Sequence, residues 1–363
     1  MAPNPLPPLP VIDLSPLSLA NPSKDALRSL SQSLHHALST TGFLYLSNPP
    51  LTSAPAATIG LAQSFFSLPS HIKQNVAKTS FNPDNSNTYR GFFPPQPTTI
   101  SSNLKEGFDL GPPSTRRSPE RNPKERICLD EPSVWPSFPL FQQERHQLEQ
   151  LHIDLQSLSQ TLLSLLAQAL GKEPTYFTYL EPDSISTLRL LHYPSSTPPT
   201  HTHPSPNSPA TENVGGDNDF SCSSHTDSGL LTLLTQDSTG GLEVLLTTSD
   251  RKEEWTPIPP LPGTLVVNVG DLMAYVTGGR YKATMHRVRR AKGRERWSVP
   301  FFFEPGERCV VRPLDVGERE GGSEGEGQGE KDGVVYGEHV RGKMRGWVEF
   351  QEREKGDEGG GGA

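Results

Sequence analysis

The chain contains segments with helical and segments with extended patterns of hydrophobic residues. Leucines recur every three or four residues in two stretches, and a glycine follows each stretch. That pattern is typical of amphipathic helices that bury one face and end at the glycine. A weaker pattern follows the first stretch and is divided in two at Pro69. The spacing predicts four helices, at residues 24–41, 56–66, 69–77 and 142–171.

Short apolar runs bounded by glycine, proline and asparagine dominate the second half of the chain. Runs of this length, with turn residues between them, are typical of strands. We expect strands at residues 11–12, 43–48, 186–193, 230–235, 242–246, 264–268, 272–276, 283–289 and 296–303. Many short strands separated by turns indicate a mainly β protein with helices, built around a double-sheet barrel.

The other segments are polar and rich in proline, glycine or charge. We expect disorder at 1–8 and 351–363, loops at 80–103 and 112–138, an insertion at 194–224, and an acidic low-complexity insert at 317–333. The folded parts are then an N-terminal region at 9–125, the long supporting helix at 142–171, a β domain at 180–310 and a C-terminal helix at 334–350.

Charge and cysteine content exclude several classes of protein. The formal net charge is −8, and the segments 317–333 and 351–363 contribute six of those negative charges. The folded body is therefore nearly neutral, which argues against a nucleic-acid partner. Three widely spaced cysteines without a CxxC motif indicate reduced thiols and a cytoplasmic location. Because no long apolar segment or leader pattern is present, we expect no membrane partner. We also expect a monomer.

Three residues have the spacing of a metal site. His225 and Asp227 are two positions apart, so in an extended strand their side chains point the same way. His286 follows 59 residues after Asp227 and must be brought to them by the fold. Two imidazoles and one carboxylate on one face of a metal leave coordination positions open, as in non-haem Fe(II) oxygenases.

A second pair of residues has the chemistry of an anion clamp. Arg296 lies ten positions after His286, and Ser298 shares its parity on the same expected strand. A guanidinium fork suits a carboxylate, and the hydroxyl adds one donor. Fe(II), the Asp227 carboxylate and a 2-oxo dicarboxylate sum to one negative charge, which Arg296 would neutralise. A metal site alone would not need this pair.

These motifs, together with their surroundings, resemble the iron- and 2-oxoglutarate-dependent dioxygenases of the isopenicillin N synthase-like group. The matching text is "SHTDSGLLTLLTQDSTGGLEVL", "LVVNVGDLMAYVTGGRYKATMHRV" and "RWSVPFFFEP". Earlier segments, "PVIDLS", "TTGFLYLSN", "YRGFFP" and "LRLLHYP", extend the likeness over most of residues 8–306. The resemblance implies a jelly-roll (double-stranded β-helix) core with an N-terminal helical region.

The resemblance also implies a reaction and a set of ligands. Fe(II) would be bound by His225, Asp227 and His286, with 2-oxoglutarate and O2 as co-substrates and ascorbate allowed as an accessory reductant. Oxidative decarboxylation to succinate and CO2 would drive oxidation of a C–H bond in a small organic substrate, within secondary metabolism. Tyr193 matches a tyrosine that often holds the co-substrate carboxylate, but Leu191 stands where many relatives have asparagine.

Other interpretations remain open at this point. The same group contains oxidases that use O2 without 2-oxoglutarate and that keep the Arg–Ser pair. A zinc hydrolase or a non-catalytic jelly-roll binding protein could also be built on these residues, although the first would leave the Arg–Ser pair idle. His201 and His203 form a competing HxH in a polar segment with no acidic partner, which favours a solvated loop.

Parity along the strands leads to two further expectations. Phe302 shares the parity of Arg296 and should face the cavity, while Phe301 and Phe303 should pack on the opposite side. Arg189 alternates with Tyr193, so it faces either the cavity or a surface salt bridge.

Overall fold

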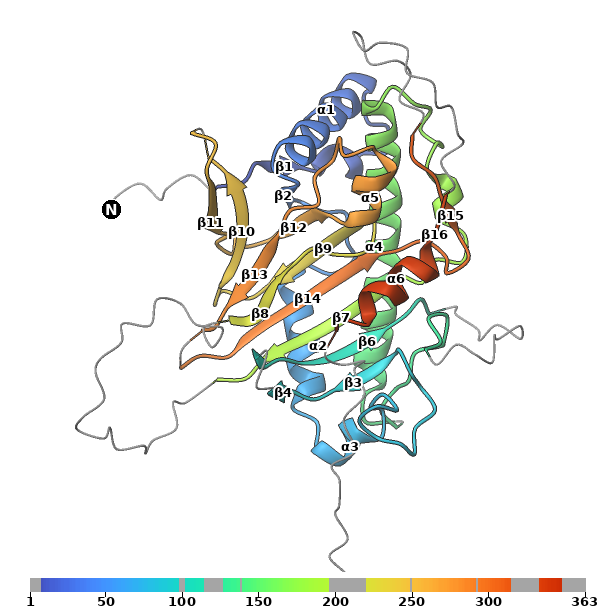
Figure 1. Ribbon diagram of the computed structural model, residues 1–363, viewed down its shortest axis with the longest axis vertical. Helices are drawn as coiled ribbons and strands as arrows, with labels where there is room; N and C mark the ends of the chain where they lie inside the picture. The colour runs from blue at the N-terminus through green and yellow to red at the C-terminus, as the bar shows by residue number, and fades with distance from the viewer. Residues whose placement is uncertain are drawn as a thin grey trace, which may run out of the picture.

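Two sheets form the core of the computed structural model (Figure 1), which describes residues 8–97, 102–113, 127–137, 139–195, 220–248, 250–291, 293–314 and 333–347. The large sheet has eight strands, mostly antiparallel. In sheet order they are β1 (Val11–Asp13), β2 (Phe43–Ser47), β12 (Thr264–Val269), β9 (Leu231–Gln236), β14 (Arg296–Phe303), β7 (Thr187–Tyr193), β6 (Glu106–Leu110) and β3 (Gly91–Phe93).

The small sheet has four strands, in the order β11 (Glu253–Pro257), β10 (Leu242–Thr247), β13 (His286–Arg289) and β8 (Phe220–His225). Two short pairs lie outside these sheets: β4 (Gln96–Pro97) with β5 (Ser102–Asn103), and β15 (Val310–Val311) with β16 (Val334–Val335). Side chains from the two main sheets form one buried cluster, here called the inner cluster, which includes Phe43, Tyr193 and Val244. The expected mainly β, double-sheet architecture is confirmed.

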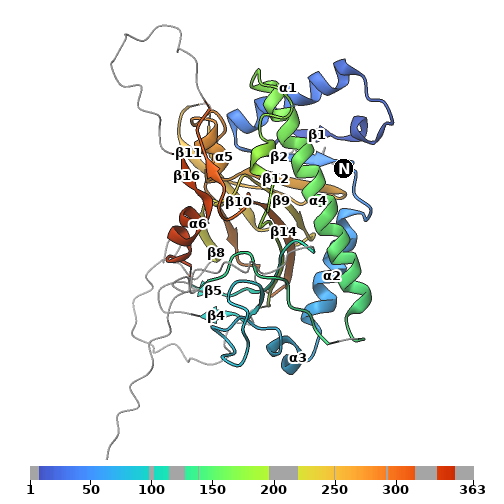
Figure 2. The same ribbon diagram turned by 90° about the vertical axis from the view of Figure 1, so that its right-hand side faces the viewer.

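Helices α1 (Lys24–Thr40), α2 (Pro55–Phe66) and α4 (Gln142–Ala169) cover the outer face of the large sheet (Figures 1 and 2). Helix α4 buries its leucine stripe against α1 and β14, and α2 packs across β7, β9 and β14. The remaining helices are α3 (Ser70–Gln74), α5 (Asp271–Val276) and α6 (Tyr336–Met344), with 3-10 turns η1 (Ser15–Ser18) and η2 (Thr178–Leu180). Helices lie at all four expected places, although α3 covers only Ser70–Gln74 of the expected 69–77.

Successive side chains of β14 point alternately to the two faces of the large sheet, one toward the helices and one toward the small sheet. Phe301 and Phe303 are buried in the main hydrophobic core beneath the helices. Arg296, Ser298 and Phe302 have the opposite parity and face the inner cluster. The expected division of these side chains between the two faces is therefore confirmed.

One expected strand is wrong. Residues 272–276 form helix α5 instead, and Leu272, Met273 and Val276 of this helix are buried. That spacing of one and three residues fits a helix rather than an alternating strand, but a run of five apolar residues is too short to distinguish the two. The helix follows Gly270 directly and closes the turn after β12.

The boundaries of the polar segments also need correction. Strand β8 occupies the last residues of the expected insertion 194–224 and runs one residue past it, and β3, β4 and the short β5 lie in the expected loop 80–103. Strand β11 was not expected, because the sequence EEWTP is polar. Edge strands such as β8 and β11 pair on one side only, so the apolar pattern that marks a strand is weak in them.

The acidic insert and the ends of the chain lie largely outside the described residues. Helix α6, with β16 before it, accounts for most of the expected C-terminal helix at 334–350. None of the helices in the described ranges combines the length and apolarity required for crossing a membrane.

Candidate metal centre and carboxylate clamp

The fold brings His225, Asp227 and His286 together. His225 ends β8, His286 begins β13, and the two residues are direct partners across the small sheet. The Nε2 atoms of His225 and His286 lie 3.8 and 3.7 Å from Asp227 Oδ1. One ligand atom from each residue lies within 4.8 Å of the others, and no other such group of potential metal ligands occurs in the described ranges. This spacing suits one ion bound by all three.

Each of the three side chains is held through its other polar atom. His225 Nδ1 lies 2.8 Å from the Ser223 carbonyl oxygen, and His286 Nδ1 lies 3.1 Å from that of Thr284. A carbonyl oxygen can only accept, so both Nδ1 atoms carry hydrogen and both Nε2 atoms are directed at the shared space. The donor set therefore fits a divalent cation.

The carboxylate of Asp227 is fixed in the same way. Its Oδ2 accepts hydrogen bonds from Thr232 Oγ1 at 2.6 Å and from Asn268 Nδ2 at 2.8 Å. These donors come from β9 and β12 of the large sheet, which lie side by side with Thr232 opposite Asn268. Oδ1 is consequently the oxygen aimed at the two imidazoles. Nothing in the sequence around Asp227 identified these two partners.

The protonation states differ between the two imidazoles. Burial, together with the nearby His225, lowers the pKa of His286 to about 4, so this ring is neutral at physiological pH. Burial opposes the charged form of His225, but Cys222 and Asp227 raise its pKa to about 9. Burial raises the pKa of Asp227, but the two imidazoles and its hydrogen bonds outweigh this and lower it. Without metal, His225 is therefore protonated and is paired with Cys222, whose pKa is lowered to about 5 by Lys105 and His225 against the effect of burial.

The loop that carries Asp227 is tied down from two sides. The backbone N–H of Asp271, at the start of α5, donates to the Asp227 carbonyl oxygen at 2.8 Å. Lys343 of α6 donates to the Thr226 carbonyl oxygen at 3.0 Å and also pairs with Asp271. The segment mistaken for a strand and the C-terminal helix therefore both support the metal loop, a role that only the folded chain reveals.

Arg296 and Ser298 form a buried pair on β14. Their exposed fractions are 2% and 1%, and Arg296 Nη1 donates to Ser298 Oγ at 3.0 Å. Arg296 Nε donates to the Gly240 carbonyl oxygen at 2.7 Å, which fixes the direction of the fork. A fully buried guanidinium normally faces an anion, because an unpaired charge is costly away from water.

The surroundings of Arg296 fit a carboxylate. Nη2 of Arg296 lies 3.4 Å from Gln236 Oε1, while the buried Nε2 of the same Gln236 finds no acceptor among the described residues. A carboxylate beside the guanidinium would supply that acceptor as well as the missing negative charge. Arg296 and the candidate metal ligands border the same inner cluster. Tyr193 of this cluster lies against Arg296, and the ring centres of Phe43 and His286 lie 5.4 Å apart.

Tyr193 lies beside this clamp. It is opposite Arg296 on the neighbouring strand β7, and the Arg296 guanidinium carbon lies 4.7 Å from the centre of its ring. The ring thus supports the guanidinium by a cation–π contact. Leu191, in the position of the absent asparagine, is buried in the inner cluster. His201 and His203, the competing HxH, lie outside the described residues.

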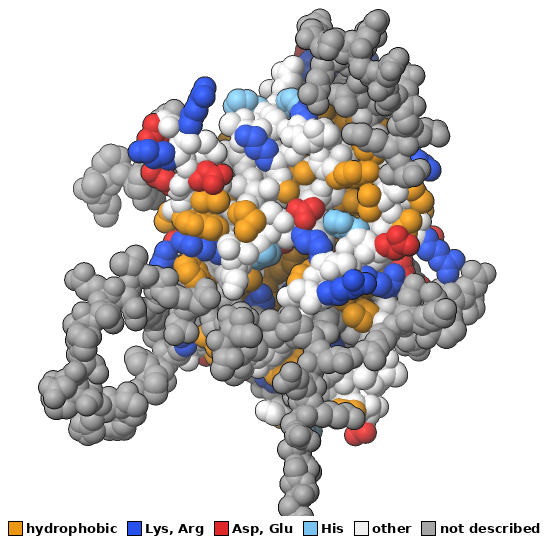
Figure 3. All heavy atoms as spheres, viewed as in Figure 1, with side chains coloured by type: hydrophobic (Ala, Val, Ile, Leu, Met, Phe, Trp, Pro, Cys, Tyr) orange, Lys and Arg blue, Asp and Glu red, His pale blue; other side chains and the backbone are white. Residues whose placement is uncertain are grey.

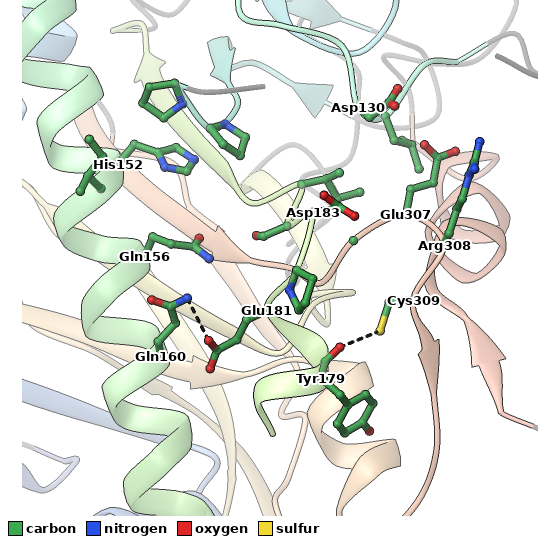
Figure 4. Close-up of a pocket in the computed structure, with 18 of the residues that line it drawn as sticks. Asp130, His152, Gln156, Gln160, Tyr179, Glu181, Asp183, Glu307, Arg308 and Cys309 are labelled. Atoms are coloured by element: carbon green, nitrogen blue, oxygen red, sulfur yellow. Dashed lines mark hydrogen bonds between the residues drawn. The ribbon is translucent and has the colours of Figure 1, made fainter. Parts of the chain in front are cut away.

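The candidate metal centre is separate from a second cavity. The face seen in Figure 3 is hollowed near its middle, where Figure 1 places β8, β14 and α6, and hydrophobic, histidine and basic side chains gather around the hollow. A cavity of about 1090 Å³ lies elsewhere, between α4, the residues after η2 and the segment before β15 (Figure 4). Its walls include Gln156, Glu181 and Glu307 but none of the three candidate ligands.

Comparison with known proteins identifies the family. Residues 184–305 match the 2OG-Fe(II) oxygenase superfamily, and residues 9–138 match the family described as non-haem dioxygenase in morphine synthesis N-terminal. The 2-oxoglutarate-dependent dioxygenase citB of Monascus ruber is 32% identical over 340 residues, which are 92% of this chain and 93% of citB. The chain belongs to the 2OG-Fe(II) oxygenase superfamily.

Other relatives agree with this assignment. Clavatol oxidase claD of Penicillium crustosum is 31% identical over 352 residues, covering 93% of this oxygenase and 95% of claD. The solved structure of a full-length Neurospora crassa protein in complex with alpha-KG has a TM-score of 0.68 at 22% identity, covering 93% of this chain and 95% of that protein. This oxygenase therefore has the expected jelly-roll core and is a 2-oxoglutarate-dependent dioxygenase that uses Fe(II).

The proton on His225 predicts how metal uptake by the oxygenase depends on pH. A metal ligand must be a neutral imidazole, so binding must displace this proton while His286 is already neutral. The apparent affinity for Mn(II), a redox-stable probe, should rise about tenfold per pH unit between about pH 6 and about pH 8. Calorimetry in buffers of different ionisation heat should show about one proton released. A flat pH dependence would contradict the assignment of a protonated His225.

The donors to Asp227 predict a second effect. Asn268→Ala and Thr232→Val each leave Oδ2 with one donor fewer, which should weaken Mn(II) binding by roughly 10- to 100-fold. Equilibrium dialysis measures this directly. Thr248→Val is the matched control, because Thr248 makes an equivalent bond to the exposed Asp250. Unchanged Mn(II) affinity in both Asn268→Ala and Thr232→Val would show that the Asp227 carboxylate keeps its orientation without these two hydrogen bonds.

Proposed function

We propose that His225, Asp227 and His286 hold Fe(II) on one face of the oxygenase cavity. The observation that carries this proposal is that each of the three side chains uses one polar atom for a hydrogen bond to the protein and leaves the other directed at the same space. The atom left in this way on each side chain lies within 4.8 Å of its two counterparts. Three ligands on one face leave room for a bidentate co-substrate and O2.

The proposed role of Arg296 and Ser298 is to receive the distal carboxylate of 2-oxoglutarate. The hydrogen bond from Arg296 Nε to the Gly240 carbonyl oxygen already orients the guanidinium. Ser298 Oγ accepts from Arg296 Nη1, so the hydroxyl and this nitrogen would lie side by side at the ligand carboxylate. Tyr193 would act through its ring, by supporting the guanidinium, rather than necessarily through its hydroxyl. Rigid placement of these groups fixes the co-substrate before the substrate enters.

When bound, iron and 2-oxoglutarate supply the oxidative chemistry: O2 is reduced, the 2-oxo acid becomes succinate and CO2, and a substrate C–H bond is oxidised. The protein contributes orientation and exclusion of water. Asp227 and the two imidazoles hold fixed directions through their back-side hydrogen bonds. The inner cluster, with the Phe43 ring against the His286 ring, supplies apolar side chains on one side of the centre.

We further propose that the substrate is a small organic molecule that is hydroxylated, desaturated or otherwise oxidised in secondary metabolism. The support is family membership and the relatives' names, among them clavatol oxidase. We propose a monomeric enzyme in the cytoplasm, and the free state of Cys128, Cys222 and Cys309 supports the cytoplasmic location.

The test is anaerobic addition of Fe(II) and then 2-oxoglutarate to the purified chain. A visible charge-transfer band that needs both additions, and that saturates at one equivalent of each, is the expected result. Full band formation in Arg296→Ala at the same 2-oxoglutarate concentration would argue against the proposed clamp. Oxidation of a substrate without any 2-oxoglutarate would instead favour the oxidase alternative within the same fold.

A further inference from the structure

The ammonium of Lys343, on helix α6, contacts the metal loop, which is the loop at residues 226–230 that carries Asp227. Its Nζ donates to the Thr226 carbonyl oxygen at 3.0 Å and has a longer contact of 3.5 Å with Thr226 Oγ1. It also donates to the Asp271 carboxylate at the start of α5. An ammonium has three donors, and these three oxygens account for them. Lys343 is therefore engaged at the metal loop by all its donors.

The ion pair of Lys343 with Asp271 holds both peptide groups that flank Asp227. The Thr226 carbonyl belongs to the peptide group before Asp227 and accepts from Lys343. The Asp227 carbonyl belongs to the peptide group after it and accepts from the backbone N–H of Asp271 at 2.8 Å. Because these two planar groups define the backbone dihedrals of Asp227, the two hydrogen bonds fix the direction in which its side chain leaves the backbone.

Helix α6 is anchored independently of Lys343. Tyr336, Val340 and Met344 recur every four residues and are buried in the main hydrophobic core. Lys343 lies beside this stripe, and its side chain is 26% exposed. Replacing Lys343 by an apolar residue of similar length therefore removes a donor from the metal loop, while the apolar face of the helix stays buried.

We propose that Lys343 is a positioning residue of the metal centre, which holds the peptide group before Asp227 so that the carboxylate is aimed at the ion. This inference rests on the proposed function and adds a residue 117 positions after Thr226 to the groups that set the metal affinity. Groups that orient a metal ligand commonly contribute to affinity in this way. Because coupling is reciprocal, a bound ion also strengthens the docking of Lys343 on the loop by the same factor.

The sign of the effect separates this role from a role of the charge alone. A positive charge beside the metal loop repels a divalent cation, so loss of the ammonium charge by itself would strengthen metal binding. The Asp271 carboxylate that remains would act in the same direction. Positioning predicts the opposite sign, because a loop with one hydrogen bond fewer presents the Asp227 carboxylate in a wider range of directions.

The matched control lies on the same helix. Arg341 pairs with the Glu307 carboxylate, and its side chain is 22% exposed, close to the 26% of Lys343. Glu307 lies in the segment before β15 and outside the metal loop. Arg341→Met therefore removes a comparable ion pair from α6 but leaves in place the hydrogen bonds to the two peptide groups that flank Asp227.

The experiment titrates the full metal-free chain with Mn(II) and measures binding by equilibrium dialysis. Lys343→Met should weaken binding by roughly 10- to 100-fold, the range typical of a lost partner of a metal ligand. Lys343→Arg keeps a charged donor and should recover part of that affinity, and Arg341→Met should bind as the unmodified chain does. The electron paramagnetic resonance spectrum of bound Mn(II), which reports the arrangement of its ligands, should change in Lys343→Met but not in Arg341→Met.

Hydrogen exchange provides a second readout, from the side of the helix. Mn(II) should slow amide exchange in α6 in the unmodified chain and in Arg341→Met, and should slow it less in Lys343→Met. If Lys343→Met melts early without metal, the double variant Lys343→Met with Asp271→Asn takes its place. That variant also removes the unpaired carboxylate and should show the same weakening of Mn(II) binding, since it keeps the backbone N–H of residue 271.

Equal or tighter Mn(II) binding in Lys343→Met overturns the inference, because the loop would then be held without Lys343 or only the charge of Lys343 would act. Equal weakening in Arg341→Met also overturns it, by assigning the effect to the docking of α6 in general. If the unmodified chain does not bind Mn(II), the proposed metal centre itself is overturned, and this inference with it.

Discussion

Replacing His225, Asp227 or His286 by alanine should abolish iron-dependent turnover. Each substitution removes one of the three proposed ligands, and the remaining two cannot fix an ion in the orientation that leaves adjacent positions open. Succinate formation from 2-oxoglutarate, with and without added Fe(II), measures the loss. Metal content after dialysis should fall in parallel, because the affinity and the activity depend on the same three atoms.

The control for these variants is His146→Ala, which changes an exposed histidine on α4. It should retain full activity and metal content. Without metal, the melting temperature of His146→Ala should stay close to that of the unmodified chain. That of Asp227→Ala should fall, because the buried donors Thr232 and Asn268 lose their acceptor. A variant that keeps both iron and activity would remove its residue from the metal centre.

Arg296→Ala should raise the half-saturating concentration of 2-oxoglutarate strongly. A hydrogen bond to a charged group is worth about 1.5–3 kcal/mol, so the increase should be roughly 10- to 150-fold. The buried Ser298 and Gln236 would also lose the partner that orients them. Initial rates over a range of 2-oxoglutarate concentrations, at fixed iron, give this value.

Two further variants calibrate that result. Ser298→Ala should act in the same direction but more weakly, since one neutral donor is lost. Arg294→Ala changes an exposed arginine two residues earlier and should have no effect. An unchanged 2-oxoglutarate dependence in Arg296→Ala would contradict the clamp and favour an oxidase that works without this co-substrate.

The candidate site was predictable from sequence where geometry is local. His225 and Asp227, and likewise Arg296 and Ser298, are two positions apart, and the parity of a strand suffices to aim each pair at one point. The position of His286 relative to them could be expected only through the family resemblance. The structure adds its physical basis, which is direct pairing of β13 with β8.

Partners that support the site could not be predicted, because they come from distant strands and helices. Thr232 and Asn268 are ordinary polar residues within apolar runs, and nothing local marks them as donors to Asp227. Lys343 lies 117 positions after Thr226 and meets it only because α6 packs beside the metal loop. Parity alone places Arg189 either at the cavity or in a surface salt bridge, and only the pairing of β6 with β7 shows Asp109 opposite it.

Errors in the expected fold have a common cause. Patterns of hydrophobic residues report burial, and burial is ambiguous in short segments. The segment 272–276 is buried but is a helix, and the backbone N–H groups of Asp271 and Leu272 at its start donate to the carbonyl oxygens of Asp227 and Gly229 before β9. Strand β8 is largely polar, and its pairing with β13 makes it extended. Long helices such as α4 were predictable, because their leucine stripe spans many turns.

With iron at the proposed centre, the pairing of His225 with His286 would tie the lifetime of the protein to the supply of iron. These residues are 61 positions apart in the sequence. Lys343, which contacts Thr226 in the loop that carries Asp227, is synthesised later still. A growing chain therefore could not bind metal at this site until nearly all of it has left the ribosome. A metal that binds only the finished small sheet stabilises it by mass action, by about 2.7 kcal/mol when free metal exceeds its dissociation constant 100-fold. Newly made protein in iron-starved cells would lack this stabilisation, and quality-control proteases would degrade the metal-free protein faster than the metal-bound form.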